Sequence, residues 1–279
     1  MRRLIEELMR LEWRLRRRAD HRITFLASSG AELQRFERAG LPTILVGNTS
    51  LCDERIYRPL PGRRARFHAV YDARLSDFKR HPLAAEVPDL ALITYLSKDE
   101  GAPGYRASLA PLLARAHVFN GDPLGGGYRY LSPPEVNECL NQCAVGLALS
   151  REEGGMYASM QYLMAGLPVV STPSEGGRGD FYHPDYVRIV DPEPRAVAAA
   201  VAELRHCKLS AEEIHTRTLA IARVHRERLF RCVDEIYASQ GLGRSFEAEW
   251  PSVFVNQLLS ESADPVPGVL EAIRAAHPG

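Results

Sequence analysis

Two basic residues, Arg74 and Lys79, follow a short apolar run at residues 66–71. The run is rich in aromatic and small apolar side chains, which is typical of a buried strand. Because the ligands of open α/β sheets bind beyond the carboxyl ends of the strands, both side chains are expected at a ligand site. Arg can grip two phosphate oxygens at once and Lys supplies a point charge, so the pair suits a diphosphate. Basic residues in this position are more often solvated surface, and that interpretation stays open.

An acidic, glycine-containing loop at residues 150–155 opens a helical pattern at residues 157–165. Its Gly154 and Gly155 let the backbone approach a ligand closely, and the helix N-terminus offers amide N–H groups to an anion. A carboxylate in the loop, from Glu152 or Glu153, can accept hydrogen bonds from sugar hydroxyls. The simpler alternative is that these acids only favour the helix N-terminus electrostatically. A second glycine-rich loop at residues 171–180 follows another strand, and alone it is more typical of a plain turn.

The elements that must position these residues alternate between short apolar runs and helical patterns. Strands are predicted at residues 23–27, 43–46, 66–71, 90–95, 117–119, 145–149, 168–171 and 187–190, and helices at residues 29–39, 105–115, 134–143, 157–165, 195–206 and 210–238. This alternation predicts an α/β fold with a Rossmann-like parallel sheet and helices on both faces, followed by a helical extension. Ser132 is expected to cap a helix that has Pro in its first turn, and Gly166 to end another.

Composition narrows the class of protein. The chain has 279 residues, 35 basic and 35 acidic, and the zero net charge argues against a nucleic-acid partner. Its five cysteines are odd in number and loosely spaced, which predicts reduced thiols and no metal site. No apolar run approaches the length of a bilayer span, and the basic N-terminus lacks the apolar core of a signal peptide. We therefore expect a cytoplasmic protein.

The residue spacing predicts amphipathic helices near both ends of the sequence. Residues 1–18 place Leu4, Leu8, Leu11 and Leu15 on one stripe among many Arg residues. Peripheral contact with a membrane through residues 1–18 is one interpretation, and packing on the body or on a partner is the simpler one. Near the other end, apolar residues recur at roughly helical spacing and are expected to pack on the N-terminal segment or on a partner chain. They are Phe246, Trp250, Phe254 and Leu258.

Together, these segments resemble the C-terminal domain of the retaining GT-B glycosyltransferases that carry an E-x7-E motif. That family has a strand followed by Gly-Arg-Leu and a nearby Lys, then a Glu that opens a helix closing on Ala, Gly and Pro-Val. Arg74, Leu75 and Lys79 match the first motif, Glu153 matches the first Glu, and residues 165–170 match the close. The resemblance covers roughly residues 20–205, and the ordered combination is much more specific than any one part.

The resemblance implies roles for particular residues. Arg74 and Lys79 would hold the diphosphate of a nucleotide-sugar donor, and Glu153 would bind hydroxyls of the donor sugar. Gly154 and Gly155 would bring backbone amides near the sugar and phosphate. Base recognition would rely on backbone groups, here around residues 121–131. The resemblance assigns no catalytic residue, no metal and no cofactor besides the donor itself.

The sequence also departs from the family pattern. Gln161 stands where the second Glu usually contacts the ribose, and its amide oxygen can still accept a hydrogen bond. Asp72 and Ala73 replace the usual Val-Gly before Arg74. Because an inward acid would repel a diphosphate, we expect Asp72 to point away from the site.

The largest departure is the short N-terminal part. We expect residues 1–45 to be a remnant of the N-terminal domain, residues 46–209 the nucleotide-sugar-binding domain and residues 210–279 a helical extension. The implied function is transfer of a sugar, with retention, from a nucleoside-diphosphate donor to an unknown acceptor. The alternative is a non-catalytic donor-binding subunit that needs a partner chain or a second copy for the acceptor side. A dinucleotide-binding enzyme is disfavoured because no Gly-x-Gly-x-x-Gly follows the first strand.

Overall fold

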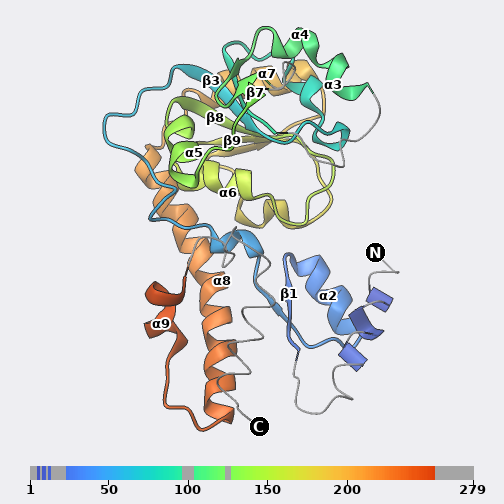
Figure 1. Ribbon diagram of the computed structural model, residues 1–279, viewed down its shortest axis with the longest axis vertical. Helices are drawn as coiled ribbons and strands as arrows, with labels where there is room; N and C mark the ends of the chain where they lie inside the picture. Colours follow the sequence, from blue (N-terminus) through green and yellow to red (C-terminus); the bar gives the residue numbers. More distant parts are fainter. Residues whose placement is uncertain are drawn as a thin grey trace.

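The computed structural model describes residues 23–95, 104–122 and 127–254, with residues 5, 6, 8–10, 12 and 13 near the N-terminus. The predicted helix at residues 1–18 and Leu258 therefore lie largely or wholly outside the described residues. Figure 1 shows two parts stacked along the long axis, with the main sheet in the upper part and β1, α2 and α9 in the lower part. The long helix α8 (Ala211–Ser239) runs from one part into the other.

The upper part is built on a six-stranded sheet in which every neighbouring pair is parallel. Its spatial order is β10 (Val187–Ile189), β9 (Val169–Ser171), β8 (Cys143–Ala148), β3 (Phe67–Asp72), β4 (Leu90–Ile93) and β5 (His117–Val118). The chain lays down β3, β4 and β5 in one direction and then returns to add β8, β9 and β10 on the other side of β3. The strand order therefore reverses between β3 and β8, and such a switch point is where open α/β sheets bind ligands.

Helices cover both faces of this sheet, as the alternating pattern predicted. Figure 1 shows one group below the sheet and one above it. The lower group is α5 (Pro133–Leu140) and α6 (Tyr157–Met164), and the upper group is α3 (Tyr105–Ser108), α4 (Ala110–Leu113) and α7 (Pro194–Leu204). Helix α6 lies close on β8 because Gly146 has no side chain: a Cβ there would stand 2.3 Å from the ring of Tyr162. The Tyr162 hydroxyl then accepts a hydrogen bond from the backbone N–H of Asp72, 2.6 Å away, at the end of β3.

The lower part contains a parallel pair, β1 (Phe25–Ala27) and β2 (Thr43–Leu45), joined through α2 (Gly30–Arg38). The short 3-10 turn η1 (Asn48–Leu51) then leads the chain toward the main sheet. Helix α8 fastens this crossover: Arg226, which is 4% exposed, donates to the carbonyl oxygens of Ser50 and Cys52 at 2.7 Å each. His225 accepts a hydrogen bond from the Gly47 N–H at 3.1 Å. The two parts are therefore joined by buried hydrogen bonds as well as by the chain itself.

Two predicted helices are wrong in their extent. The helix predicted at residues 134–143 ends at Leu140, because Cys143 already pairs with Phe67 as the first residue of β8. Asn141 supports the turn between helix and strand by donating to the Arg58 carbonyl oxygen at 3.1 Å. The helix predicted at residues 105–115 is two short helices, α3 and α4, and Pro111 in the first turn of α4 lacks the N–H that a continuous helix would use.

The aromatic residues predicted near the C-terminus pack within the chain. Helix α9 (Phe246–Val253) folds back so that Phe246 and Trp250 contact the ring of Phe230 on α8, with centroids 5.8 and 5.1 Å away. Phe254 stacks on Trp250 at 4.3 Å and is buried. These contacts account for the predicted apolar face up to Phe254. None of the helices that the structure describes is long and apolar enough to cross a membrane.

Candidate functional site

The carboxyl ends of β3, β4 and β8 surround a cavity of about 400 Å³ at the switch point of the main sheet. It contains most of the residues that the sequence marked as candidates. The lining is Asp72, Ala73, Lys79, Tyr95, Tyr130, Glu153, Gly155, Met156, Tyr157, Ala158 and Gln161. We call it the donor cavity, after the nucleotide-sugar donor that the family resemblance implies. Arg74 lies outside this lining, and Gly154 lines a neighbouring cavity instead.

Lys79 and Glu153 meet inside the donor cavity. Lys79 ends the 3-10 turn η2 (Asp77–Lys79) that follows β3, and its Nζ forms an ion pair with Oε1 of Glu153. Both side chains are mostly buried, at 12% and 15% exposure. The Ser150 hydroxyl donates to the same carboxylate oxygen at 2.8 Å. Two residues that are 74 positions apart in sequence therefore share one hydrogen-bonded centre.

Arg74 and Lys79 both contact the ring of Phe78. The Arg74 guanidinium stands 5.0 Å from the centroid of the Phe78 ring, and the Lys79 ammonium also stands 5.0 Å from it. Such cation–π contacts hold both basic groups against one aromatic surface. Arg74 is partly exposed.

The expectation that Asp72 points away from the site is wrong. Asp72 lines the donor cavity together with Lys79, because its place at the carboxyl end of β3 brings it to the same edge of the sheet. Burial raises the pKa of Asp72 to about 7, and the nearby Lys79 ammonium opposes this rise. A carboxyl group with this pKa is largely neutral below pH 7, so it repels a diphosphate less than an ordinary Asp would.

The two glycine-rich loops are held together by backbone hydrogen bonds. Glu153 N–H donates to the Glu175 carbonyl oxygen at 2.9 Å, and Gly177 N–H donates to that of Gly154 at 2.9 Å. Gly176 has a φ of +117°, and a Cβ there would lie 1.8 Å from the Glu153 carbonyl oxygen. Only glycine fits this position, so the second glycine-rich loop supports the loop that carries Glu153.

Gly155 and Gln161 have neighbours from the first 60 residues of the chain. A Cβ on Gly155 would lie 2.2 Å from Oδ1 of Asn48, so the absence of a side chain lets η1 approach the loop. Gln161 is 8% exposed, and its Nε2 donates to the Tyr57 hydroxyl at 2.9 Å. This hydrogen bond uses one N–H of the amide and leaves its oxygen able to accept a hydrogen bond from a ligand.

Two arginines support the site, the buried Arg178 and the partly exposed Arg80, and the sequence analysis did not single them out. Arg178, 3% exposed, donates to the carbonyl oxygens of Ser150 at 2.9 Å and Thr172 at 2.7 Å. Arg80 donates to the Leu149 carbonyl oxygen and to the Thr172 hydroxyl, each at 2.7 Å. Together these side chains tie the chain after β8 to the chain after β9. Arg178 lies in the second glycine-rich loop, but nothing in that loop's sequence indicates which carbonyl oxygens its side chain contacts.

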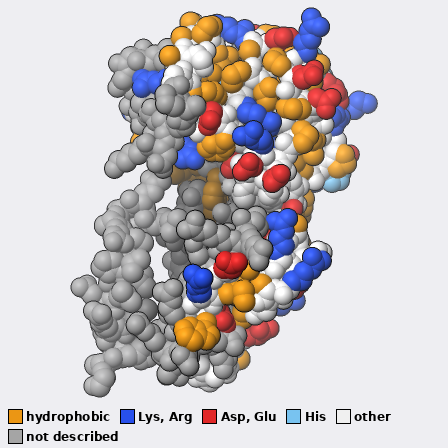
Figure 2. Space-filling model, turned by 90° about the vertical axis from the view of Figure 1, so that its right-hand side faces the viewer, with side chains coloured by type: hydrophobic (Ala, Val, Ile, Leu, Met, Phe, Trp, Pro, Cys, Tyr) orange, Lys and Arg blue, Asp and Glu red, His pale blue; other side chains and the backbone are white. Residues whose placement is uncertain are grey.

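A second cavity, of about 640 Å³, lies where α2 faces the glycine-rich loops. Its lining is Ser29, Ala31, Glu32 and Arg35 on one side and Glu152, Glu153, Gly154, Glu175, Gly176 and Gly177 on the other. In Figure 2 acidic side chains gather between the upper and lower parts of the visible face, with Lys or Arg side chains above and below them. Glu153 lines both cavities, so the donor cavity and this one are neighbours.

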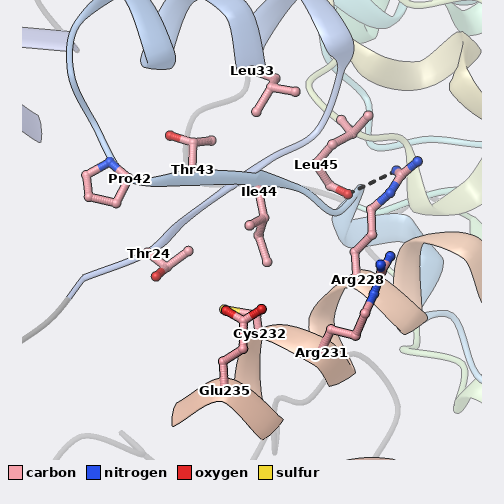
Figure 3. A pocket seen from close by; sticks show the side chains of 10 residues that line it. All are labelled: Thr24, Leu33, Pro42, Thr43, Ile44, Leu45, Arg228, Arg231, Cys232 and Glu235. Atoms are coloured by element: carbon pink, nitrogen blue, oxygen red, sulfur yellow. Dashed lines mark hydrogen bonds between the residues drawn. The ribbon is translucent and has the colours of Figure 1, made fainter. Parts of the chain in front are cut away.

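A third cavity, of about 600 Å³, lies between β2 and α8. Figure 3 shows Ile44 of β2 pointing toward the α8 side chains of Cys232 and Glu235, while Arg228 donates to the Leu45 carbonyl oxygen. This cavity shares no lining residue with the other two. Among the described residues, no group of three or more His, Cys, Asp or Glu side chains is placed to hold a metal ion. All five cysteines are free thiols.

Solved structures of glycosyltransferases share this fold. Anabaena HepE in complex with UDP is similar at 17% identity and a TM-score of 0.57, covering 77% of this chain and 63% of that one. Sucrose-phosphate synthase from Thermosynechococcus elongatus is similar at 13% identity and a TM-score of 0.59, covering 77% and 59%. A glycosyltransferase from Rickettsia africae is similar at 13% identity and a TM-score of 0.55, covering 77% and 62%.

These similarities define the fold of the chain. The six-stranded parallel sheet with its flanking helices is the Rossmann-like fold of GT-B glycosyltransferases. The chain spans about three fifths of the length of these structures. No family model and no curated protein sequence matches it.

Proposed function

We propose that this chain binds a nucleoside-diphosphate sugar in the donor cavity and transfers the sugar, with retention, to an acceptor. The observation that carries the proposal is the position of Lys79 and Glu153. A buried ammonium follows β3, and a carboxylate that can accept hydroxyl hydrogen bonds follows β8. They stand on the two sides of the switch point, where open α/β sheets bind ligands.

Each candidate residue then has a chemical task. Lys79 and Arg74 neutralise the diphosphate, Glu153 accepts hydrogen bonds from the donor sugar, and Gln161 accepts one from the ribose through its amide oxygen. During transfer the bond from the anomeric carbon to the phosphate oxygen breaks, and its electron pair leaves with the diphosphate. A new bond forms between that carbon and an acceptor oxygen, whose proton passes to an oxygen of the leaving diphosphate. Fixed positive charge at the leaving group lowers the barrier to this step.

The chain divides into three proposed parts. We propose that residues 1–45 are a remnant of the N-terminal domain, residues 46–209 form the donor-binding domain and residues 210–279 an extension that joins the two. Gly154, which lines the second cavity, and Gly155, which lines the donor cavity, would present their backbone to the donor sugar. The basic N-terminal segment, residues 1–18, would supply any peripheral contact with a membrane.

A second candidate function is a donor-binding subunit without its own catalysis. The observation that favours it is the lining of the donor cavity, in which every residue with a proposed role binds the donor and none carries out the chemical step. In this case a partner protein or a second copy of the chain would complete the acceptor side. Release of nucleotide from a donor by the purified chain alone would exclude this candidate.

Calorimetric titration with UDP, GDP and ADP tests the donor site. We expect saturable binding of at least one nucleotide, and its loss in an Arg74→Ala, Lys79→Ala double variant. The matched control replaces Arg195 and Lys208 by Ala, because both are exposed and distant from the cavity in sequence and fold. Equal binding by the wild type and the Arg74, Lys79 variant would contradict the assignment. Absence of binding to all three nucleotides would contradict the enzyme activity of this chain alone.

A further inference from the structure

The order of strands in the main sheet sets the direction in which a donor lies. Glu153 follows β8, Lys79 follows β3, and β4 and β5 continue on the far side of β3. If the sugar contacts Glu153 and the diphosphate contacts Lys79, as proposed above, the nucleoside must extend over the ends of β4 and β5. The chemistry of the side chains at these strand ends then decides how the nucleoside is held.

Two tyrosines occupy this end of the donor cavity. Tyr95 follows β4, Tyr130 follows the hairpin strand β7 (Gly127–Tyr128), and both line the cavity with Lys79. Their ring centroids are 6.0 Å apart at an interplanar angle of 33°. Tyr95 is half-buried, whereas Tyr130 is 74% exposed, which is unusual for a large aromatic residue beside a cavity. Burial raises the pKa of Tyr95 to about 12, so its hydroxyl keeps its proton.

Asn120 holds the two tyrosines at this spacing. It is 4% exposed and lies between Thr94 and Arg129, the residues directly before Tyr95 and Tyr130. Its Oδ1 accepts from the Thr94 N–H at 3.1 Å, and its Nδ2 donates to the Thr94 and Arg129 carbonyl oxygens. Its own carbonyl oxygen accepts from the Arg129 N–H at 3.0 Å. One buried amide side chain thus fastens both segments that carry the rings.

We propose that Tyr95 and Tyr130 form a stacking surface for the nucleobase of the donor and that Asn120 is its positioning residue. The proposal rests on the proposed function, since the direction of the donor follows from the assigned sugar and diphosphate ends. Aromatic side chains stack on the π-face of any base, so this surface takes purine as well as pyrimidine nucleotides. It binds the base and leaves the diphosphate to Lys79 and Arg74.

Titration of the full chain with UDP, ADP, GDP and inorganic pyrophosphate separates the contribution of the base to binding from that of the diphosphate. Tyr130→Ala is expected to weaken nucleotide binding by roughly ten- to a hundredfold, and more for ADP and GDP than for UDP because a purine offers more stacking area. Pyrophosphate affinity is expected to stay as in the wild type.

Tyr130→Phe, which keeps the ring, is expected to bind nucleotides within about threefold of the wild type. Asn120→Asp, which removes the Nδ2 donor, is expected to lower nucleotide affinity without changing that for pyrophosphate.

Arg129→Ala serves as the control on the same loop, because the Arg129 side chain points to Glu135 and is 63% exposed. Unchanged nucleotide affinity in Tyr130→Ala, or an equal loss of affinity for pyrophosphate, would overturn the stacking proposal while leaving the donor site in place. Failure of the wild type to bind any nucleotide, with a folded protein, would overturn the donor site itself and the stacking surface with it.

Discussion

Lys79 and Glu153 neutralise each other in the structure, although the proposed donor needs them separately. The ammonium pairs with Oε1 of the carboxylate, and both side chains are at most 15% exposed. Under the proposed function, an arriving diphosphate would compete with Glu153 for Lys79, and a sugar hydroxyl would compete with Lys79 for Glu153. Binding of the diphosphate would then release the carboxylate proposed to bind the sugar and so couple the two halves of the donor.

Glu153→Gln should consequently have opposite effects on two ligands. Without the competing carboxylate, a free nucleoside diphosphate should bind about fivefold more tightly, which corresponds to an ion pair worth about 1 kcal/mol. The matching nucleotide sugar should bind more weakly than in the wild type, because a neutral amide is a weaker acceptor for hydroxyls than a carboxylate. Parallel calorimetric titrations measure both constants, and Glu203→Gln on α7 is a suitable control. A loss of affinity for both ligands would argue against competition for Lys79.

Asp72 should make donor binding depend on pH. Its pKa is raised to about 7 by burial, so lowering the pH from 8 to 6 neutralises a carboxylate in the donor cavity. Nucleoside diphosphate affinity relative to Asp72→Asn should therefore rise toward pH 6. The comparison with Asp72→Asn cancels the titration of the nucleotide itself, and parallel curves for the two proteins would show that Asp72 does not face the ligand.

The same carboxyl group should affect stability. Because its pKa is higher in the folded chain than the ordinary 3.8, the folded state holds this proton more tightly, and stability is lost as the pH rises through about 7. Asp72→Asn should therefore be more stable than the wild type at pH 8, by about 1–2 kcal/mol, and the difference should shrink toward pH 4. Urea unfolding at pH 4, 6 and 8 measures it. A constant difference would mean that the charge of Asp72 is well solvated.

The sequence predicted the strands and their buried, parallel character well, because apolar runs bounded by turns are local signals. It also placed Lys79 and Glu153 after two different strands. It could not show that β3 and β8 are neighbours, since β4 and β5 lie between them along the chain. The ion pair between these residues is a consequence of that topology.

The contacts of Arg178 and Asn120 leave no signal in the local sequence. Arg178 and Asn120 act through backbone carbonyl oxygens of distant segments, and neither spacing nor residue type reveals such partners. The wrong prediction for the orientation of Asp72 has a different cause. That prediction rests on the repulsion expected between an ionised Asp72 and a diphosphate. Burial raises the pKa of this carboxyl group, so the repulsion is weaker than for an ordinary Asp. The family pattern alone therefore misjudged a position where this chain differs from it.

Arg178 should be a large contributor to stability. Arg178→Ala removes the guanidinium donor from the carbonyl oxygens of Ser150 and Thr172, of which only that of Thr172 keeps another donor, the Ser171 hydroxyl, and it removes a buried side chain. We expect a loss of about 3 kcal/mol in the free energy of unfolding, measured by urea titration. Arg188→Ala is the control, because its ion pair with Glu203 is exposed and should cost at most about 0.5 kcal/mol. Equal losses in the two variants would show that the Arg178 contacts are weak.

The glycine-rich loops offer a matched pair of substitutions. Gly176→Ala places a Cβ on a residue with a φ of +117° and only 1.8 Å from the Glu153 carbonyl oxygen, so the backbone must move. We expect it to lose about 2–3 kcal/mol of stability and most of its affinity for a nucleotide sugar, since the shifted carbonyl belongs to the residue that binds the sugar. Gly154→Ala has open space around its Cβ and should change the free energy of unfolding by less than about 1 kcal/mol. Thermal unfolding and donor titration of both variants test this difference. If Gly176→Ala bound the donor as the wild type does, the second glycine-rich loop would not be what positions Glu153.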